Sequence, residues 1–190
     1  IPWQIAFTLR DMGWYLRQEV IWEKPNCMPE SVTDRCVKSH ESVFLFAKNQ
    51  RYYFDYKAIQ EPVAQSTIER VKRGVSENNK YVIGAPGQTA QSINKPRSAL
   101  SLKIPQKRNR RSVWSIPNQP LKESHYASFP RALVEPCILA GCPTGGTVLD
   151  PFMGSGTTAM TAKLLDRHYI GFELNPEYIK ICEKRIKEGR

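Results

Sequence analysis

The fold of this chain is decided by Val148-Leu149-Asp150-Pro151-Phe152-Met153-Gly154-Ser155-Gly156-Thr157-Thr158. An apolar run ends in an acid, turns through two glycines and enters a helical pattern that continues to Leu165. This order predicts a strand, a tight turn and a helix whose N-terminal N–H groups face a ligand. Gly154 and Gly156 suit such a turn, because glycine adopts backbone angles that other residues avoid and lets a ligand approach closely.

A second apolar segment, residues 168–174, predicts a neighbouring strand with Glu173 near its end. Roughly 20 residues beyond a glycine turn, a carboxylate is placed to hold the hydroxyls of an adenosine ribose. The glycine turn by itself is equally typical of an ordinary strand-to-helix connection. Asp150 and Glu173 at the ends of successive strands favour a nucleoside with a polar or cationic tail, because two carboxylates would repel a pyrophosphate.

The length and composition predict one domain with a hydrophobic core and no membrane segment. The chain has 190 residues, 41% of them hydrophobic, and no apolar run reaches the ~18 residues of a membrane span. Its five cysteines include no C-x-x-C pair, so the sequence predicts no metal site. Reduced, partly buried thiols of this kind are typical of a cytoplasmic protein.

The positive charge is concentrated in the middle of the sequence. Residues 62–124 contain 12 Lys and Arg against 3 acids, which accounts for nine of the ten net positive charges. The run Lys107-Arg108-Asn109-Arg110-Arg111 is the densest part, and Trp114 follows it closely. A basic run is often only a solvated surface, but a segment this lopsided favours contact with a nucleic acid.

Periodicity outlines the remaining elements. Helices are predicted over residues 2–12, from Phe129-Pro130 to Gly141, and over residues 176–187, the last with Asn175 as its N-cap and a basic final turn. Strands are predicted over residues 14–23, 41–48 and 52–55. Because so few residues separate the last two, we expect them to form an antiparallel hairpin at one edge of a mixed sheet.

The order of these elements argues against a dehydrogenase. A dinucleotide-binding domain begins with its glycine turn and adds several strands after it. Here 17 residues follow Glu173, enough for one helix. The remaining strands of the sheet must therefore come from the part of the chain that precedes the turn.

Two phrases resemble a known family. Val-Leu-Asp-Pro-Phe-Met-Gly-Ser-Gly-Thr-Thr, followed by Ile-Gly-Phe-Glu-Leu-Asn-Pro-Glu-Tyr, resembles the S-adenosylmethionine-dependent DNA amino-methyltransferases of the permuted β class. The resemblance implies a Rossmann-like methyltransferase fold with a mixed, mostly parallel sheet and an inserted basic region. It implies three parts: a scaffold with the hairpin (1–61), a target-recognition insertion (62–124) and a cofactor-binding half (125–190).

The resemblance also implies roles for individual residues. S-adenosylmethionine would be held by Asp150, Phe152, Gly154, Ser155, Gly156, Thr157, Glu173 and Asn175, with His125, Phe129 and Pro130 around its methionine end. Thr157 and Ser155 could also cap the helix, and His125 could equally be structural. Double-stranded DNA would be contacted by Lys107, Arg108, Arg110 and Arg111, and by Tyr52 or Tyr53 near a base flipped out of the duplex. Packing at the sheet edge is an equal alternative for these two tyrosines.

The catalytic motif of the family is absent from residues 1–190. The family carries Asp or Ser followed by Pro-Pro-Tyr or Pro-Pro-Trp, and this sequence contains no Pro-Pro pair, so it offers no catalytic residue. We expect a fragment of a restriction-modification type enzyme that transfers a methyl group to the exocyclic amino group of cytosine or adenine and is inactive by itself. A non-catalytic DNA-binding relic and an RNA methyltransferase are the alternatives, and a homodimer stays open.

Overall fold

The computed structural model describes residues 1–73, 106–119 and 129–189. The chain divides into two compact units, one formed by residues 1–59 and 111–190 and the other by residues 60–110. No helix in the described ranges is long and apolar enough to cross a membrane.

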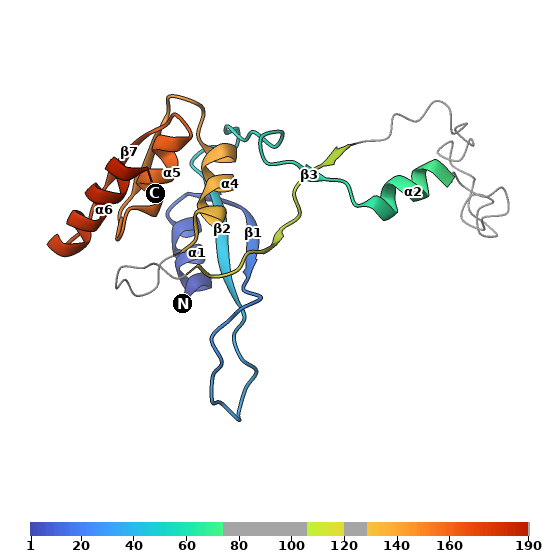
Figure 1. Cartoon of the computed structure of the whole chain (residues 1–190), viewed down its shortest axis with the longest axis horizontal. Coiled ribbons are helices and arrows are strands. Elements are labelled where there is room, and N and C mark those ends of the chain that lie inside the picture. Colours follow the sequence, from blue (N-terminus) through green and yellow to red (C-terminus); the bar gives the residue numbers. More distant parts are fainter. Residues whose placement is uncertain (74–105, 120–128, 190) are drawn as a thin grey trace. The chain divides into compact units, whose positions relative to one another are not determined.

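A three-stranded sheet forms the first part of the larger unit. Helix α1 (Pro2–Asp11) leads into strand β1 (Tyr15–Glu23), which pairs antiparallel with β2 (His40–Ala47) and parallel with the short β5 (Val113–Ser115). Figure 1 shows β1 and β2 side by side as a ribbon. The prediction of helix 2–12 and of the strands at 14–23 and 41–48 is confirmed to within two residues.

The core under this sheet is built around Trp22, which is 4% exposed. Its indole N–H donates to the carbonyl oxygen of Ile116 at 2.8 Å, so the buried polar atom is satisfied. The other buried members are Val20, Trp114, Ile116 and Leu133, with Val43 and Phe129 packed against them. Leu133 belongs to α4 (Arg131–Gly141), which therefore covers this core.

The second part of the larger unit contains the glycine turn. Strands β6 (Thr147–Asp150) and β7 (His168–Gly171) are parallel neighbours, joined by helix α5 (Thr157–Leu164). Helix α5 contacts α4, both strands and the last helix, α6 (Pro176–Glu188). Residues 157–162 are all buried in consequence. The predicted strand–turn–helix–strand order is confirmed.

The predicted hairpin between residues 41–48 and 52–55 is wrong. Strand β2 pairs with β1 instead, and residues 52–55 form no strand. The N–H of Asp55 donates to the carbonyl oxygen of Ala140 at the end of α4, and its Oδ1 accepts from the N–H groups of Lys57 and Ala58. These bonds turn the chain away from the edge of β2, where a ladder would have needed an extended backbone.

Residues 113–115, predicted to belong to the basic middle segment, are part of the three-stranded sheet instead. They pair with Ile21, Trp22 and Glu23 of β1, and Trp114 is 8% exposed. Three residues are too few for a periodic pattern to reveal a strand. Trp114 is therefore a core residue of the sheet.

The smaller unit is simpler. Two short strands, β3 (Glu61–Pro62) and β4 (Lys107–Arg108), pair antiparallel, and helix α2 (Gln65–Arg73) follows β3. Glu61 and Arg108 lie opposite each other, with Oε1 and Nε 2.9 Å apart. Such a pair of opposite charges directly across two strands stabilises their register.

Candidate functional site

The glycine turn has the backbone that the sequence predicts. Gly154 has φ +54° and Gly156 has φ +82°, both in the left-handed region that favours glycine. The carboxylate of Asp150 accepts a hydrogen bond from the N–H of Phe152 at 2.9 Å and so fixes the start of the turn. Gly156 is then the N-cap of α5.

Glu173 lies directly beside this turn. Strand β7 ends at Gly171, and the carboxylate two residues later accepts from the N–H of Gly154 at 2.8 Å and from that of Asn175 at 2.8 Å. A backbone hydrogen bond also joins the two segments, since the N–H of Met153 donates to the carbonyl oxygen of Phe172 at 2.8 Å. The structure thus brings Glu173 to the glycine turn, as predicted.

With these hydrogen bonds in place, Glu173 can still bind a ligand that carries hydroxyl groups. A carboxylate oxygen can accept more than one hydrogen bond, so ribose hydroxyls can join the existing bonds without displacing the turn. Two apolar side chains next to the carboxylate and the turn are exposed, Phe152 at 85% and Leu174 at 101%. The turn therefore offers a carboxylate and apolar surface together, a combination typical of small-molecule sites.

Gly156 is in close contact with helix α6. A Cβ atom added at Gly156 would lie 2.4 Å from Sγ and 3.1 Å from Cβ of Cys182 in α6. The interpretation that Gly156 makes room for a ligand therefore needs correction: in the structure its missing side chain makes room for α6. This is the role of a glycine that allows tight packing of secondary-structure elements after the turn.

Arg185 of α6 is hydrogen-bonded to the turn. Its Nη1 donates to the carbonyl oxygen of Ser155 at 2.7 Å and to Ser155 Oγ at 2.9 Å, and it lies 3.3 Å from Thr157 Oγ1. Arg185 is 9% exposed, Ser155 3% and Thr157 5%. The hydroxyls of these two predicted cofactor-binding residues thus contact a buried arginine. The role of Arg185 is not visible in the sequence pattern, where this residue is only one of the basic residues in the final turn of the helix.

Cys182 of α6 packs against Gly156 of the turn. Burial raises the pKa of its thiol, and the carboxylates of Glu183, Asp150 and Glu173 raise it further, while the nearby Arg185 lowers it. The thiol is therefore protonated at neutral pH and is a poor nucleophile. The thiol ionises at a lower pH in the unfolded chain than in the folded chain. The free energy of unfolding therefore decreases as the pH rises into the alkaline range where only the unfolded chain is ionised.

The other predicted cofactor residues are placed as follows. The side chain of Asn175 accepts from the N–H of Glu177 at 3.0 Å, which confirms it as the N-cap of α6. Phe129 packs against the core of the three-stranded sheet, and Pro130 is buried at the start of α4. His125 lies outside the described residues.

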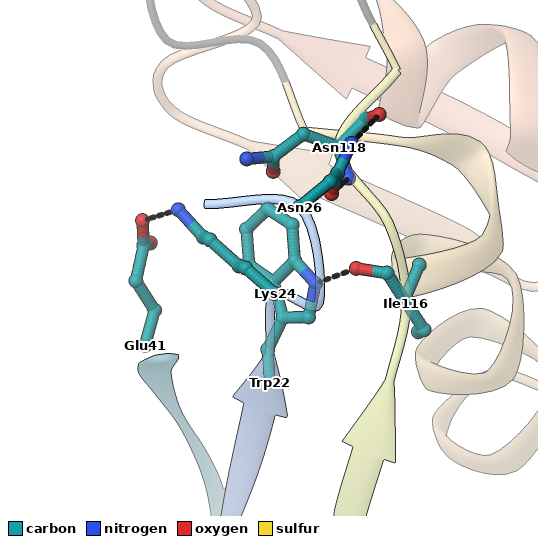
Figure 2. A network of polar contacts seen from close by, with 6 residues as sticks. All are labelled: Trp22, Lys24, Asn26, Glu41, Ile116 and Asn118. Atoms are coloured by element: carbon teal, nitrogen blue, oxygen red, sulfur yellow. Dashed lines mark hydrogen bonds and ion pairs between the residues drawn. The ribbon is translucent and has the colours of Figure 1, made fainter. Parts of the chain in front are cut away.

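A polar network lies at the carboxyl end of β1, shown in Figure 2. The ammonium of Lys24 lies 4.3 Å from the centre of the Trp22 ring and forms an ion pair with Glu41 of β2. Asn26 makes a reciprocal pair with the backbone of Asn118, donating to its carbonyl oxygen at 3.0 Å and accepting from its N–H at 2.7 Å. The network joins β1, β2 and the segment that follows β5.

The predicted DNA-contacting residues are divided between the two units. Tyr52 and Tyr53 are exposed in the larger unit, where the guanidinium of Arg17 lies 4.9 Å from the centre of the Tyr52 ring. Lys107 is exposed, whereas Arg108 is bound to Glu61. Arg110 is half-buried, and Arg111 is exposed. Within the described ranges, His, Cys, Asp and Glu form no group of three or more that could hold a metal ion.

Comparison with known proteins gives a family match over nearly the whole chain. A family model described as DNA methylase (N6_N4_Mtase) matches residues 3–184. Type II methyltransferase M.SmaI of Serratia marcescens is 40% identical over 190 residues, which is 100% of this chain and 52% of M.SmaI. The chain spans about half the length of M.SmaI and of other curated type II methyltransferases.

Solved structures show the same fold. The crystal structure of an M1.HpyAVI–SAM complex superposes with a TM-score of 0.59 at 24% identity, covering 96% of this chain and 68% of that one. The cytosine-N4-specific PvuII DNA methyltransferase gives a TM-score of 0.63 at 18% identity, covering 100% of this chain and 64% of that one. The α/β fold predicted from the glycine turn is therefore that of the methyltransferases.

Proposed function

Because the chain belongs to the N6/N4 DNA methylase family, we propose that it binds S-adenosylmethionine at the glycine turn and serves methyl transfer to the exocyclic amino group of cytosine or adenine in double-stranded DNA. The observation that carries this proposal is the hydrogen bond between Glu173 and the N–H of Gly154, 2.8 Å long, at the carboxyl ends of two parallel strands. Ligands of open α/β sheets bind at this end of the strands.

In this proposal the residues around the turn divide into two groups. Glu173 accepts from the ribose hydroxyls, Phe152 and Leu174 flank the adenine, and the negative charge of Asp150 favours the cationic end of the cofactor. Ser155 and Thr157 bind Arg185, and these bonds keep the turn in place. When bound, S-adenosylmethionine supplies a methyl group that its sulfonium charge activates.

The ribose contact can be tested with Glu173→Gln. We expect the Kd for S-adenosylmethionine to rise about 10- to 100-fold, because the amide loses the charge that strengthens bonds from two hydroxyls. Isothermal titration of the purified chain measures this. Glu177→Gln is the matched control, since that exposed acid pairs only with Lys180 in the described contacts of α6. Equal affinity of the two variants would contradict the assignment of Glu173.

We also propose that the basic middle segment is the target-recognition region, inserted between the scaffold and the cofactor-binding half of a permuted methyltransferase. Two findings support this. Residues 60–110 form a compact unit, and residues 113–115 return to the sheet of the larger unit. The recognition segment is then better bounded at residues 60 and 110 than at 62 and 124.

The phosphate contacts in this segment should differ in strength. Replacing Lys107 by Gln should reduce the salt slope of duplex binding by up to about 0.9, the value of one phosphate contact. Arg108→Gln should change the slope less, because Glu61 already neutralises that guanidinium at 2.9 Å. Fluorescence anisotropy of a labelled duplex over a salt series measures both slopes. An unchanged slope for Lys107→Gln would remove this residue from the interface.

The 190-residue polypeptide should be a poor catalyst by itself. By family resemblance the Pro-Pro-Tyr or Pro-Pro-Trp motif holds the acceptor amino group, and these 190 residues contain no Pro-Pro pair. Without that positioning we expect methyl transfer at least about 100-fold slower than that of M.SmaI. Transfer of tritiated methyl groups to DNA measures both rates side by side. A comparable rate would show that other residues hold the acceptor.

A further inference from the structure

A hollow on the larger unit opens next to Tyr52, beside an irregularity in β1. The register of β1 against β2 shifts between Leu16 and Gln18, so Arg17 is an extra residue on its strand. Such bulges redirect a side chain and are frequent near functional sites. Here the bulged residue is an exposed arginine, and its guanidinium lies 4.9 Å from the centre of the Tyr52 ring.

The lining of the hollow combines the groups that recognise an unpaired nucleotide. Its volume is about 360 Å³, and it is lined by Leu16, Arg17, Gln18, Leu45, Tyr52 and Phe54. The rings of Tyr52 and Phe54 meet at 66° with their centres 6.5 Å apart. The lining contains one cation, one amide and no carboxylate, so it is complementary to an anion that carries a planar ring. Aromatic rings stack on bases, and arginine donates to phosphate oxygens.

Two features leave Arg17 available for such a ligand. Among the described residues no carboxylate forms an ion pair with it, in contrast to Arg10, Arg35, Arg108 and Arg131. Its contact with Tyr52 is through the ring, so the N–H donors at the edge of the guanidinium can still bind a phosphate. The same contact holds the Tyr52 ring at the wall of the hollow.

We propose that Arg17 is a positioning residue for DNA: it holds a backbone phosphate and keeps Tyr52 in place, so that the base of an unpaired nucleotide stacks in the hollow lined by Tyr52 and Phe54. This inference rests on the proposed function, because it assumes that the partner is DNA. It adds Arg17 and the bulge of β1 to the residues predicted from the sequence.

Photocrosslinking tests the stacking directly. A single-stranded oligodeoxynucleotide that carries 5-iodouracil is irradiated with the 190-residue chain, and the attachment point is mapped after trypsin digestion. Cleavage after Arg51 and Lys57 releases residues 52–57, which contain Tyr52 and Phe54. We expect the crosslink on this peptide. Crosslinks only elsewhere, with DNA bound, would overturn the proposal.

The role of Arg17 is tested by a matched pair of variants. Arg17→Gln should weaken binding of the same oligonucleotide by about tenfold and reduce the crosslink on residues 52–57 to a similar extent. Arg10→Gln is the control, because Arg10 is also exposed and lies 5.1 Å from a ring centre, that of Phe7, but does not line the hollow. Arg17→Lys should restore most of the affinity, since it keeps the charge.

Binding of S-adenosylmethionine separates this inference from the proposed function. If the unmodified chain binds neither the cofactor nor DNA, the proposed function fails and this inference fails with it. If it binds both, and Arg17→Gln behaves like Arg10→Gln, the proposed function stands and the role of Arg17 is refuted. Loss of cofactor binding in Arg17→Gln would also refute it, because the change would then act on the fold.

Discussion

Replacement of Arg185 by methionine is expected to destabilise the folded chain by about 2–4 kcal/mol, because it removes a buried charged donor and leaves two acceptors of Ser155 unsatisfied. Both are within 2.9 Å of Nη1 in the structure, and Ser155 is 3% exposed, so water does not replace the lost bonds easily. The turn that carries Gly154 is anchored by the same bonds. We therefore expect affinity for S-adenosylmethionine to fall as well.

Urea denaturation followed by circular dichroism measures the change in the free energy of unfolding. Lys184→Met is the matched control, because it also replaces one positive charge by methionine, one residue earlier and on the exposed side of α6. Arg185→Lys should recover part of the loss, since one ammonium can reach only some of the three acceptors. Similar unfolding free energies for Arg185→Met and Lys184→Met would show that Arg185 does not anchor the turn.

Replacement of Gly156 by alanine should destabilise the chain by a similar amount, about 2–4 kcal/mol, for two reasons that can be separated. An L-residue at φ +82° is strained, which costs about 1 kcal/mol. In addition, the new Cβ would lie 2.4 Å from Sγ and 3.1 Å from Cβ of Cys182, so α6 would have to move. Overpacking of this kind costs about 1–3 kcal/mol.

Gly145→Ala isolates the first of these costs. Gly145 has φ +75°, but a Cβ atom added there would meet nothing within 4 Å. The difference between the two alanine variants in thermal or urea unfolding then measures the crowding against α6. Adding Cys182→Ala to Gly156→Ala should recover part of that difference, because it removes the closest atom. If Gly156→Ala costs no more than Gly145→Ala, the packing explanation is wrong.

Cys182 and Arg185 also show why a helix that looks ordinary in the sequence matters to the site. The sequence predicts α6 correctly, with Asn175 as its N-cap, from an amphipathic pattern and a proline at its first position. A basic final turn is what the helix dipole favours on a solvated surface. Nothing local distinguishes Arg185 from its neighbours Lys184 and Lys187, which are exposed. Only the packing of α6 against the glycine turn buries Arg185.

The strand pairings depart from the prediction for a related reason. Residues 52–55 have the aromatic residues of a strand, and the connection to β2 is short enough for a hairpin. The N–H of Asp55 nevertheless donates to the carbonyl oxygen of Ala140, and the side chain of Asp55 accepts from Lys57 just beyond the segment. Conversely, the sequence of residues 113–115 does not predict a strand, but these residues pair with the edge of β1. In both places the competing partner is far away in the sequence.

The sequence by itself determined the local structure of the site: the strand, the two glycines with positive φ, the helix that follows and the acid about 20 residues later. These depend on backbone angles, periodicity and capping, which act over a few residues. Tertiary structure alone decided that Glu173 binds the N–H of Gly154, that Gly156 accommodates Cys182 and that Arg185 binds Ser155. Each of these contacts joins residues 19 to 30 positions apart, and only the packing of β7 and α6 against the turn brings them within reach.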